Sequence, residues 1–263
     1  VPTDVTDTKA VSALAKAAII EFGSIDVWVN NVGIGVVGAF DTVPFSAHRR
    51  VIEANLIGHM NGAHAALPHF KGAGRGTLIN MISIGGWAST PYSAAYTASK
   101  FGLRGFSEAL RAEVSGQPGI HVCEVYPTFV DSPGISHGAN YTGKHIEPPS
   151  PMLDPREVAD TVVALAFARH PRASTMLGSV ALPARLSHAL APDLTGRITR
   201  RLMDHALGRA DPAPVTDGNL FEPSRGHEID GGYRQAHSRA LPAAAAVVGV
   251  AALACWLAAR ARR

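Results

Sequence analysis

The sequence has few cysteines, few aromatic residues and little excess charge of either sign. Its two cysteines, Cys123 and Cys255, are too few for a disulfide framework or a cysteine-based zinc site, which suits a reducing compartment. Lys and Arg number 24 against 21 Asp and Glu, and a net charge of +3 is too small for a nucleic-acid-binding surface. The twelve histidines show no metal-ligand spacing, so we expect no metal site.

One stretch lacks charge altogether. The run from Leu241 to Ala259 carries no Asp, Glu, Lys, Arg or His, and three arginines close it: Arg260, Arg262 and Arg263. A helix of about 19 residues spans about 28 Å, close to the thickness of a bilayer core. The run is therefore a candidate membrane anchor, at the cytoplasmic face of a protein that we expect in the cytoplasm. The alternative is an alanine-rich helix packed on a partner subunit, because Pro242 and Gly249 interrupt the run.

Apolar runs alternate with helical periodicity along most of the chain. This pattern is typical of an α/β fold, a Rossmann-like doubly wound parallel sheet. With 46% hydrophobic and 17% charged residues, the chain can bury the core that such a fold needs. The pattern predicts strands over Ile25–Asn30, Thr77–Ile82, Ile120–Tyr126 and Ser174–Leu177, and helices over Asp7–Phe22, Ser46–Phe70, Ala94–Val114 and Asp154–Ala168.

The composition also divides the chain into parts. We expect an α/β domain over residues 1–191, a C-terminal extension and linker over 192–240, and the hydrophobic helix with its basic end over 241–263. The extension is predicted as short basic helical stretches followed by a polar linker over Asp211–Arg239. Within the domain, Gly134–Pro151 is rich in Gly, Pro and His and long enough to be a functional lid.

A glycine-rich match between Gly33 and Gly38 fits the dinucleotide fingerprint G-x-G-x-x-G. A true fingerprint opens a helix directly, so that the helix N-terminus faces the pyrophosphate. Here residues 39–44 come before the next predicted helix, which argues against the fingerprint.

Tyr96 and Lys100 are spaced i and i+4, on one face of a predicted helix. A cation near a phenol lowers the tyrosine pKa toward the working pH of a general acid or base. Alone, this spacing also occurs on partly exposed helix faces. Ser83 adds to it, because it follows the strand Thr77–Ile82 and so lies at the carboxyl edge of the sheet, where α/β folds bind ligands.

Together these motifs resemble the short-chain dehydrogenase/reductase family over about Asp4 to Leu177. The resemblance rests on the Asn-Asn-Val-Gly turn Asn30–Gly33 and on Asn55, Ser83, Tyr96 and Lys100 in this order and spacing. It implies that Tyr96 is the general acid or base, Ser83 hydrogen-bonds the reacting oxygen and Lys100 holds the nicotinamide ribose. It further implies that Asn55 positions a proton-relay water, for which the alternative is a helix residue satisfied by backbone contacts.

The same resemblance implies NAD or NADP as cofactor, without deciding between them. The residues expected to contact it are Asp4, Val5, Asn31, Val32, Gly33, Tyr96, Lys100, Pro127, Thr128, Val130 and Ser132. Thr128 replaces the family's glycine in the Pro-Gly segment, and Ser132 its usual threonine. The family pattern also has three strands and a glycine-rich turn ahead of the strand at Ile25–Asn30. In their absence that strand becomes an exposed sheet edge, and the chain expressed alone is expected to be poorly soluble and to fail to bind NAD or NADP.

The sequence therefore predicts an oxidoreductase that interconverts a carbonyl and a secondary alcohol on a fairly apolar small molecule, assembled as a homo-oligomer. Two alternatives stay open. One is a catalytically silent, membrane-attached fragment or interaction protein that keeps the second half of the fold. The other is an epimerase or dehydratase of the extended branch, which the Asn-Asn-Val-Gly turn disfavours.

Overall fold

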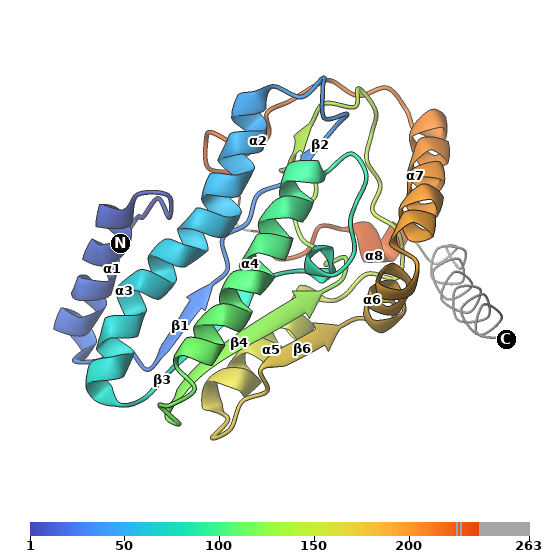
Figure 1. Ribbon diagram of the computed structural model, residues 1–263. Helices are drawn as coiled ribbons and strands as arrows, with labels where there is room; N and C mark the ends of the chain where they lie inside the picture. The colour runs from blue at the N-terminus through green and yellow to red at the C-terminus, as the bar shows by residue number, and fades with distance from the viewer. Residues whose placement is uncertain (225, 227, 237–263) are drawn as a thin grey trace, which may run out of the picture.

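A four-stranded parallel sheet forms the centre of the computed structural model, which describes residues 1–224, 226 and 228–236 (Figure 1). The strand order is β1-β3-β4-β6, and each neighbouring pair is parallel. The prediction of an α/β fold with a parallel sheet is confirmed. The strands are β1 (Val27–Asn30), β3 (Gly76–Met81), β4 (Ile120–Pro127) and β6 (Ser174–Leu177).

Helices cover both faces of this sheet because its strands alternate apolar side chains between the faces. Leu78 of β3 packs with Phe70 and Leu110 on the side of the first helices, whereas its neighbour Ile79 packs with Leu165 on the opposite side. The elements on the first side are α1 (Thr8–Phe22), α3 (Gly58–Ala73) and α4 (Ala94–Glu113), and α5 (Pro155–Phe167) lies on the other.

Several helix boundaries follow directly from the sequence. The Asp7 side chain accepts hydrogen bonds from the first backbone N–H groups of α1, and Gly23 ends that helix with φ +81°. Asp154 caps α5 in the same way, with proline at the first helical position. Both starts were predicted from these residue types, and both are confirmed.

The helix predicted over Ser46–Phe70 is wrong in one respect, because it is not a regular α-helix. It begins as α2 (Phe45–Ile52), passes through a π-helical turn, η1 (Glu53–Ile57), and continues as α3. Such π turns are rare and often occur at functional sites.

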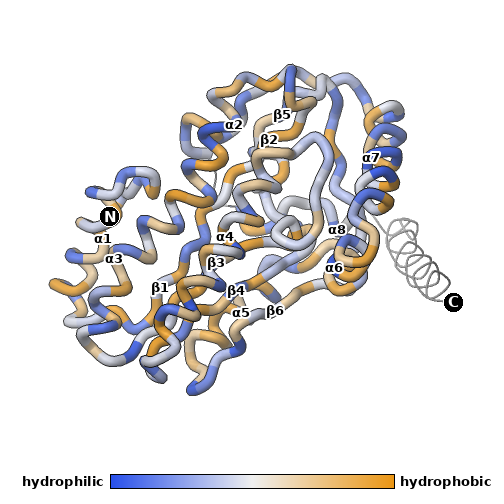
Figure 2. Tube along the Cα trace, viewed as in Figure 1, coloured by the Kyte–Doolittle hydropathy of each residue, from blue (hydrophilic) through white to orange (hydrophobic). Residues whose placement is uncertain are grey.

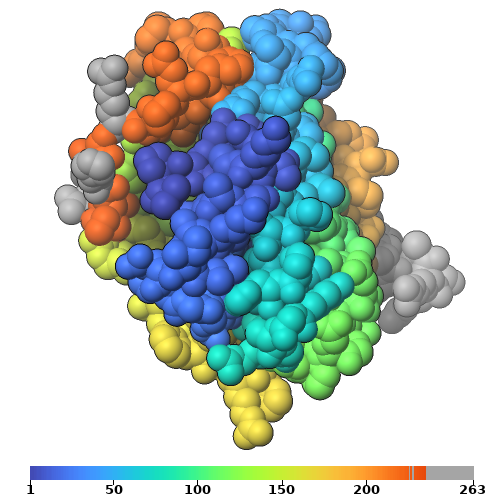
Figure 3. Space-filling view, turned by 90° about the vertical axis from the view of Figure 1, so that its left-hand side faces the viewer, coloured from blue at the N-terminus to red at the C-terminus, as the bar shows by residue number. Residues whose placement is uncertain are grey.

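β1 lies at one edge of the sheet, as predicted. In the described part of the chain it pairs only with β3, and Val29 is 40% exposed. Figure 3 looks onto this side of the molecule, where α1 (dark blue) lies next to α3 (cyan).

The chain after β6 forms two helices, α6 (Ala181–Leu190) and α7 (Pro192–Arg209), and the short α8 (Tyr233–Ala236). α7 is thus one long helix where shorter stretches were predicted. It is mostly hydrophilic, whereas α6 exposes Leu182, Leu186 and Leu190 (Figure 2). No helix in the described residues has the length and hydropathy to cross a bilayer. The candidate anchor Leu241–Ala259 lies outside these residues.

A small parallel sheet pairs β2 (Val36–Val37) with β5 (Ala139–Asn140). The stretch predicted as a polar linker pairs with this sheet, which its polar composition did not predict. Asn140 also exchanges two backbone hydrogen bonds with Thr216. We call residues 211–220 the roof segment; isolated antiparallel bridges pair Thr216 with Asn140 of β5 and Pro212 with Lys144.

Candidate active site

Three strands end at the same edge of the central sheet, and the predicted site residues follow them. Asn31 follows β1, Ser83 follows β3 and Thr128 follows β4. Since all strands of the sheet are parallel, their carboxyl ends meet at one edge, which is where open α/β sheets bind ligands. The topology therefore brings the segments of the predicted site together.

Tyr96 and Lys100 lie in the first two turns of α4 and face the sheet. Lys100 is 4% exposed, and its Nζ donates to the carbonyl of Met81 at 3.1 Å. The same Nζ lies 5.7 Å from the centre of the Tyr96 ring. Lys100 is therefore buried at the end of β3, and Tyr96 is half-buried beside it.

Ser83 stands beside Tyr96 in a strained backbone conformation. Its φ is +130°, which non-glycine residues rarely adopt. The Ser83 hydroxyl accepts a hydrogen bond from the Gly85 N–H at 3.1 Å. A Cβ atom added at Gly85 would lie 3.1 Å from the Tyr96 ring and 3.6 Å from the Ser83 oxygen. Glycine at this position thus keeps open the space that both hydroxyls border.

The pKa of Tyr96 differs from the expectation based on helical spacing. Burial raises it above its ordinary value, although a hydrogen bond with Ser83 acts in the opposite direction. Burial also lowers the pKa of Lys100 to about 7. The prediction of a lowered tyrosine pKa is wrong for the chain without cofactor, because desolvation disfavours both the phenolate and the ammonium.

Asn55 is fully buried in the π-helical turn and holds the loop after β1. Its Oδ1 accepts from the Ile34 N–H at 2.8 Å, and its Nδ2 donates to the Ile34 carbonyl at 2.9 Å and to the Ser99 hydroxyl at 3.2 Å. These contacts fit the alternative hypothesis for Asn55, a helix residue whose polar groups are satisfied by backbone contacts. Its role in a proton relay stays a prediction.

The turn after β1 borders the same space. A Cβ at Gly33 would lie 3.8 Å from the Lys100 Nζ and 3.9 Å from the Asn55 Oδ1, so glycine leaves a gap directly beside two predicted catalytic residues. Asn31 and Val32 are exposed at this edge. The arrangement fits a nicotinamide cofactor whose ribose would lie against Gly33 and Lys100, and Val36–Val37 as a strand excludes the fingerprint helix.

His59 is a residue of this site that sequence reasoning missed. Its ring is 1% exposed, and its Nε2 donates to the Val32 carbonyl at 2.8 Å. Its own carbonyl accepts from Asn30, whose amide also binds Asn80. Burial lowers the pKa of His59 to about 4. No sequence spacing marks His59, because it reaches the turn only through the packing of α3 on β1.

Asp4 and Val5 lie close to the beginning of α3. Val5 packs so tightly on Gly58 that a Cβ there would come within 2.7 Å, and its carbonyl accepts from Asn61. The Asp4 carboxylate accepts hydrogen bonds from Thr6, which lower its pKa more than any other contact. Val5, one of the residues expected to contact the cofactor, is thus anchored by the helix that also carries His59.

The segment Pro127–Ser132 begins with the last residue of β4, and Pro127, Thr128 and Asp131 are buried in it, whereas Phe129 is 40% exposed. Thr128 is 7% exposed and packs directly on the glycine that follows β6, where an added Cβ would lie 2.1 Å from the threonine oxygen. The Val130 backbone pairs with Leu153, at the far end of the expected lid. The segment is therefore held between β6 and the residues that precede α5.

The roof segment covers Tyr96 from the far side. Leu220 is 1% exposed and packs in one cluster with Val36 and Ala95, against which the Tyr96 ring lies. The Leu220 carbonyl accepts from Arg50, and Tyr141 hydrogen-bonds Asp217. In Figure 3 this part of the chain (orange) reaches the same face as the residues of α2 (light blue). The surroundings of Tyr96 are therefore largely apolar.

A parallel α/β sheet with a Tyr-Lys pair at its carboxyl edge defines a class of oxidoreductase site, and comparison with known proteins gives the family. A model described as short chain dehydrogenase matches residues 1–140. The uncharacterized oxidoreductase YxnA of Bacillus subtilis is 30% identical over 273 residues, which cover 99% of this chain and 76% of that protein. The chain belongs to the short-chain dehydrogenase family and is an oxidoreductase.

Two further comparisons agree. The mouse dehydrogenase/reductase SDR family member 7 is 39% identical over 131 residues, which cover 50% of this chain but only 39% of the mouse protein. Among solved structures, an alcohol dehydrogenase from the archaeon Thermococcus sibiricus, complexed with 5-hydroxy-NADP, superposes with a TM-score of 0.57 at 26% identity. That alignment covers 68% of this chain and 73% of the archaeal one.

Proposed function

We propose that the protein is an NAD(P)-dependent oxidoreductase that interconverts a carbonyl and a secondary alcohol on a fairly apolar substrate. The observation that carries this proposal is the position of the buried Lys100 and the half-buried Tyr96 beside Ser83, next to the gap at Gly33. The apolar cluster of Leu220, Val36 and Ala95 around Tyr96 supports an apolar substrate.

In this proposal each side chain has a defined task. The nicotinamide cofactor, when bound, supplies or accepts the hydride. Tyr96 gives its phenolic proton to the carbonyl oxygen or takes it back from the alcohol. Ser83 donates a hydrogen bond to the same oxygen as charge develops on it. A charged Lys100 next to the phenol stabilises the phenolate, and Asn55 keeps the loop at Ile34 in place and would hold a relay water.

The proposal includes a cytoplasmic location and assembly as a homo-oligomer. It leaves open the choice between NAD and NADP and the attachment to a membrane through Leu241–Ala259. The archaeal neighbour carries an NADP derivative, which makes NADP the first cofactor to test. The gathering of Asn55, Ser83, Tyr96 and Lys100 at one sheet edge favours an enzyme over a silent interaction protein.

The test uses the protein at the length at which its source produces it. We expect the protein to oxidise or reduce the nicotinamide cofactor in the presence of apolar ketones or secondary alcohols. The change in nicotinamide absorbance monitors the reaction. Tyr96→Phe should lower kcat by at least about 100-fold, because it removes the proton donor. Tyr92→Phe is the matched control and should stay close to wild type. Wild-type activity in Tyr96→Phe would contradict the proposed site.

A further inference from the structure

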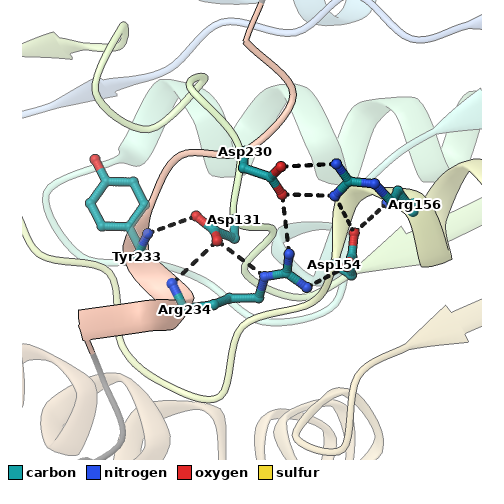
Figure 4. A network of polar contacts seen from close by, with 6 residues as sticks. All are labelled: Asp131, Asp154, Arg156, Asp230, Tyr233 and Arg234. Atoms are coloured by element: carbon teal, nitrogen blue, oxygen red, sulfur yellow. Dashed lines mark hydrogen bonds and ion pairs between the residues drawn. The ribbon is translucent and has the colours of Figure 1, made fainter.

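A network of charged side chains joins three segments that lie far apart in the sequence (Figure 4). Asp131 comes from the segment after β4, Asp154 and Arg156 from the start of α5, and Asp230 and Arg234 from the end of the described chain. We call Asp230–Arg234 the latch segment. It lies in the stretch that the composition predicted as a polar linker.

The centre of the network is a buried carboxylate. The Asp131 side chain is 3% exposed and accepts three hydrogen bonds: from the backbone N–H of Tyr233 at 2.9 Å, from that of Arg234 at 3.2 Å and from the Arg234 Nε at 3.1 Å. Burial alone would raise the pKa of Asp131, but these hydrogen bonds outweigh it and hold the pKa below its ordinary value. Asp131 is therefore ionised at neutral pH and fixes both the backbone and the side chain of the latch segment.

Glycine lets the latch segment lie directly on the backbone of the segment after β4. The Gly231 N–H donates to the Asp131 carbonyl at 3.1 Å. A Cβ at Gly231 would lie 2.8 Å from the carbonyl oxygen of Ser132 and 2.9 Å from the Asp131 Oδ1. These contacts involve the backbone and a buried carboxylate, so they cannot simply move aside. The fit is thus one of shape as well as charge.

The network also fixes the point at which the lid Gly134–Pro151 leaves and rejoins the domain. The Asp131 N–H donates to the Leu153 carbonyl at 3.0 Å, which ties the two ends of the lid together. Arg234 bonds Asp154 on the returning side, and Arg156 makes two bonds to Asp230, at 2.8 and 2.9 Å. Both ends of the lid are therefore attached to the latch segment.

We propose that Asp131 and Arg234 are positioning residues of the active site: the docked latch segment holds Pro127–Ser132 and the base of the lid in the conformation that binds the nicotinamide. This inference rests on the proposed function. It assigns a role in the cofactor site to Arg234, which lies 103 positions after its partner Asp131.

The first test measures hydrogen exchange in the natural-length protein. Arg234→Met removes the charged contacts, and Gly231→Ala introduces the backbone clash without changing any charge. Both should accelerate exchange of the amides between Phe129 and Asp154 by about tenfold. The matched controls are Arg49→Met, which breaks the exposed pair with Glu53, and Gly196→Ala, where a Cβ meets no atom within 4 Å. Unchanged exchange in both latch variants would overturn the proposal.

The second test separates positioning from mere stability. In Arg234→Met, the Kd for reduced cofactor should rise about five- to tenfold at a temperature well below the melting temperature of the variant, where loss of folded protein cannot account for it, and Arg234→Lys should restore only part of the affinity. Faster exchange with an unchanged Kd would show that the latch is structural and would overturn the positioning role. A wild type that binds neither cofactor would refute the proposed function, and the exchange experiment would still decide whether the latch holds the lid.

Discussion

His59 should make the fold sensitive to acid between pH 6.5 and 4. Its Nε2 donates to the Val32 carbonyl, and its Nδ1 has no hydrogen-bond partner among the described residues. A second proton would place a charge on a ring that is 1% exposed and close to the Lys100 ammonium. Burial is the larger cause and Lys100 the smaller one of the lowered pKa.

The magnitude follows from linkage. His59 has a pKa of about 4 in the folded chain and 6.5 when unfolded, so between these values the unfolded chain binds more protons. Stability is therefore lost as the pH falls from 6.5 to 4. At about 1.4 kcal/mol per pH unit, the full loss is about 3 kcal/mol, a large part of the stability of an ordinary domain.

The assay is urea unfolding followed by tryptophan fluorescence at several pH values between about 4 and 7. His59→Gln keeps a donor for the Val32 carbonyl but cannot titrate. As the pH falls from about 7 to about 4, the unfolding free energy of wild type should therefore drop by about 3 kcal/mol relative to that of the variant. His64→Gln, at an exposed position, is the control. Glu124, whose raised pKa of about 7 acts in the opposite direction, cancels in the difference. Equal pH dependence in wild type and His59→Gln would refute the reasoning.

Two further predictions concern a close contact on one helix and a buried ion pair. Gly62→Ala would place a Cβ 2.1 Å from the Asn30 Oδ1 and should cost about 1–3 kcal/mol of unfolding free energy. Gly105→Ala, with open space around it in α4, should be neutral or stabilising by up to about 1 kcal/mol. Chemical unfolding of both variants measures the difference, and equal effects would contradict the prediction. Arg111→Met removes the partner of the buried Glu124 carboxylate, 3.1 Å away. It should lower the free energy of unfolding by about 3 kcal/mol at about pH 8 and by less at about pH 5, where the carboxyl is protonated. A loss that does not depend on pH would show that the ion pair is not its cause.

Much of the fold could be predicted because its signals are local. Asp7 and Asp154 mark helix starts by the capping chemistry of their own side chains, and the apolar run of β3 marks a buried strand. The order of strands along the chain and the rule for parallel sheets then place Ser83 and Thr128 at one edge. The Tyr96-Lys100 pair is likewise local, since four residues make one turn of helix.

Other features could not be predicted because they depend on contacts between distant residues. His59 and Asn55 contact the loop after β1 only when α3 and the π-helical turn pack on the sheet. The direction of the Tyr96 pKa was wrong because burial depends on what covers the residue, which helical spacing does not report. The polar stretch after α7 gave no sign that Leu220 would lie against Tyr96.

The sequence by itself thus determined the α/β class, the helix starts and the Tyr96-Lys100 spacing, because capping and periodicity act over a few residues. Asn55 and the roles of the four residues proposed for catalysis came from the family resemblance. Only the tertiary structure decided the directions in which the pKa values of Tyr96 and Lys100 shift, the part of His59 and the docking of the latch segment on Asp131. Burial and long-range ion pairs arise when segments up to about 100 residues apart come together. Their energies belong to that assembly and not to any single stretch of the chain.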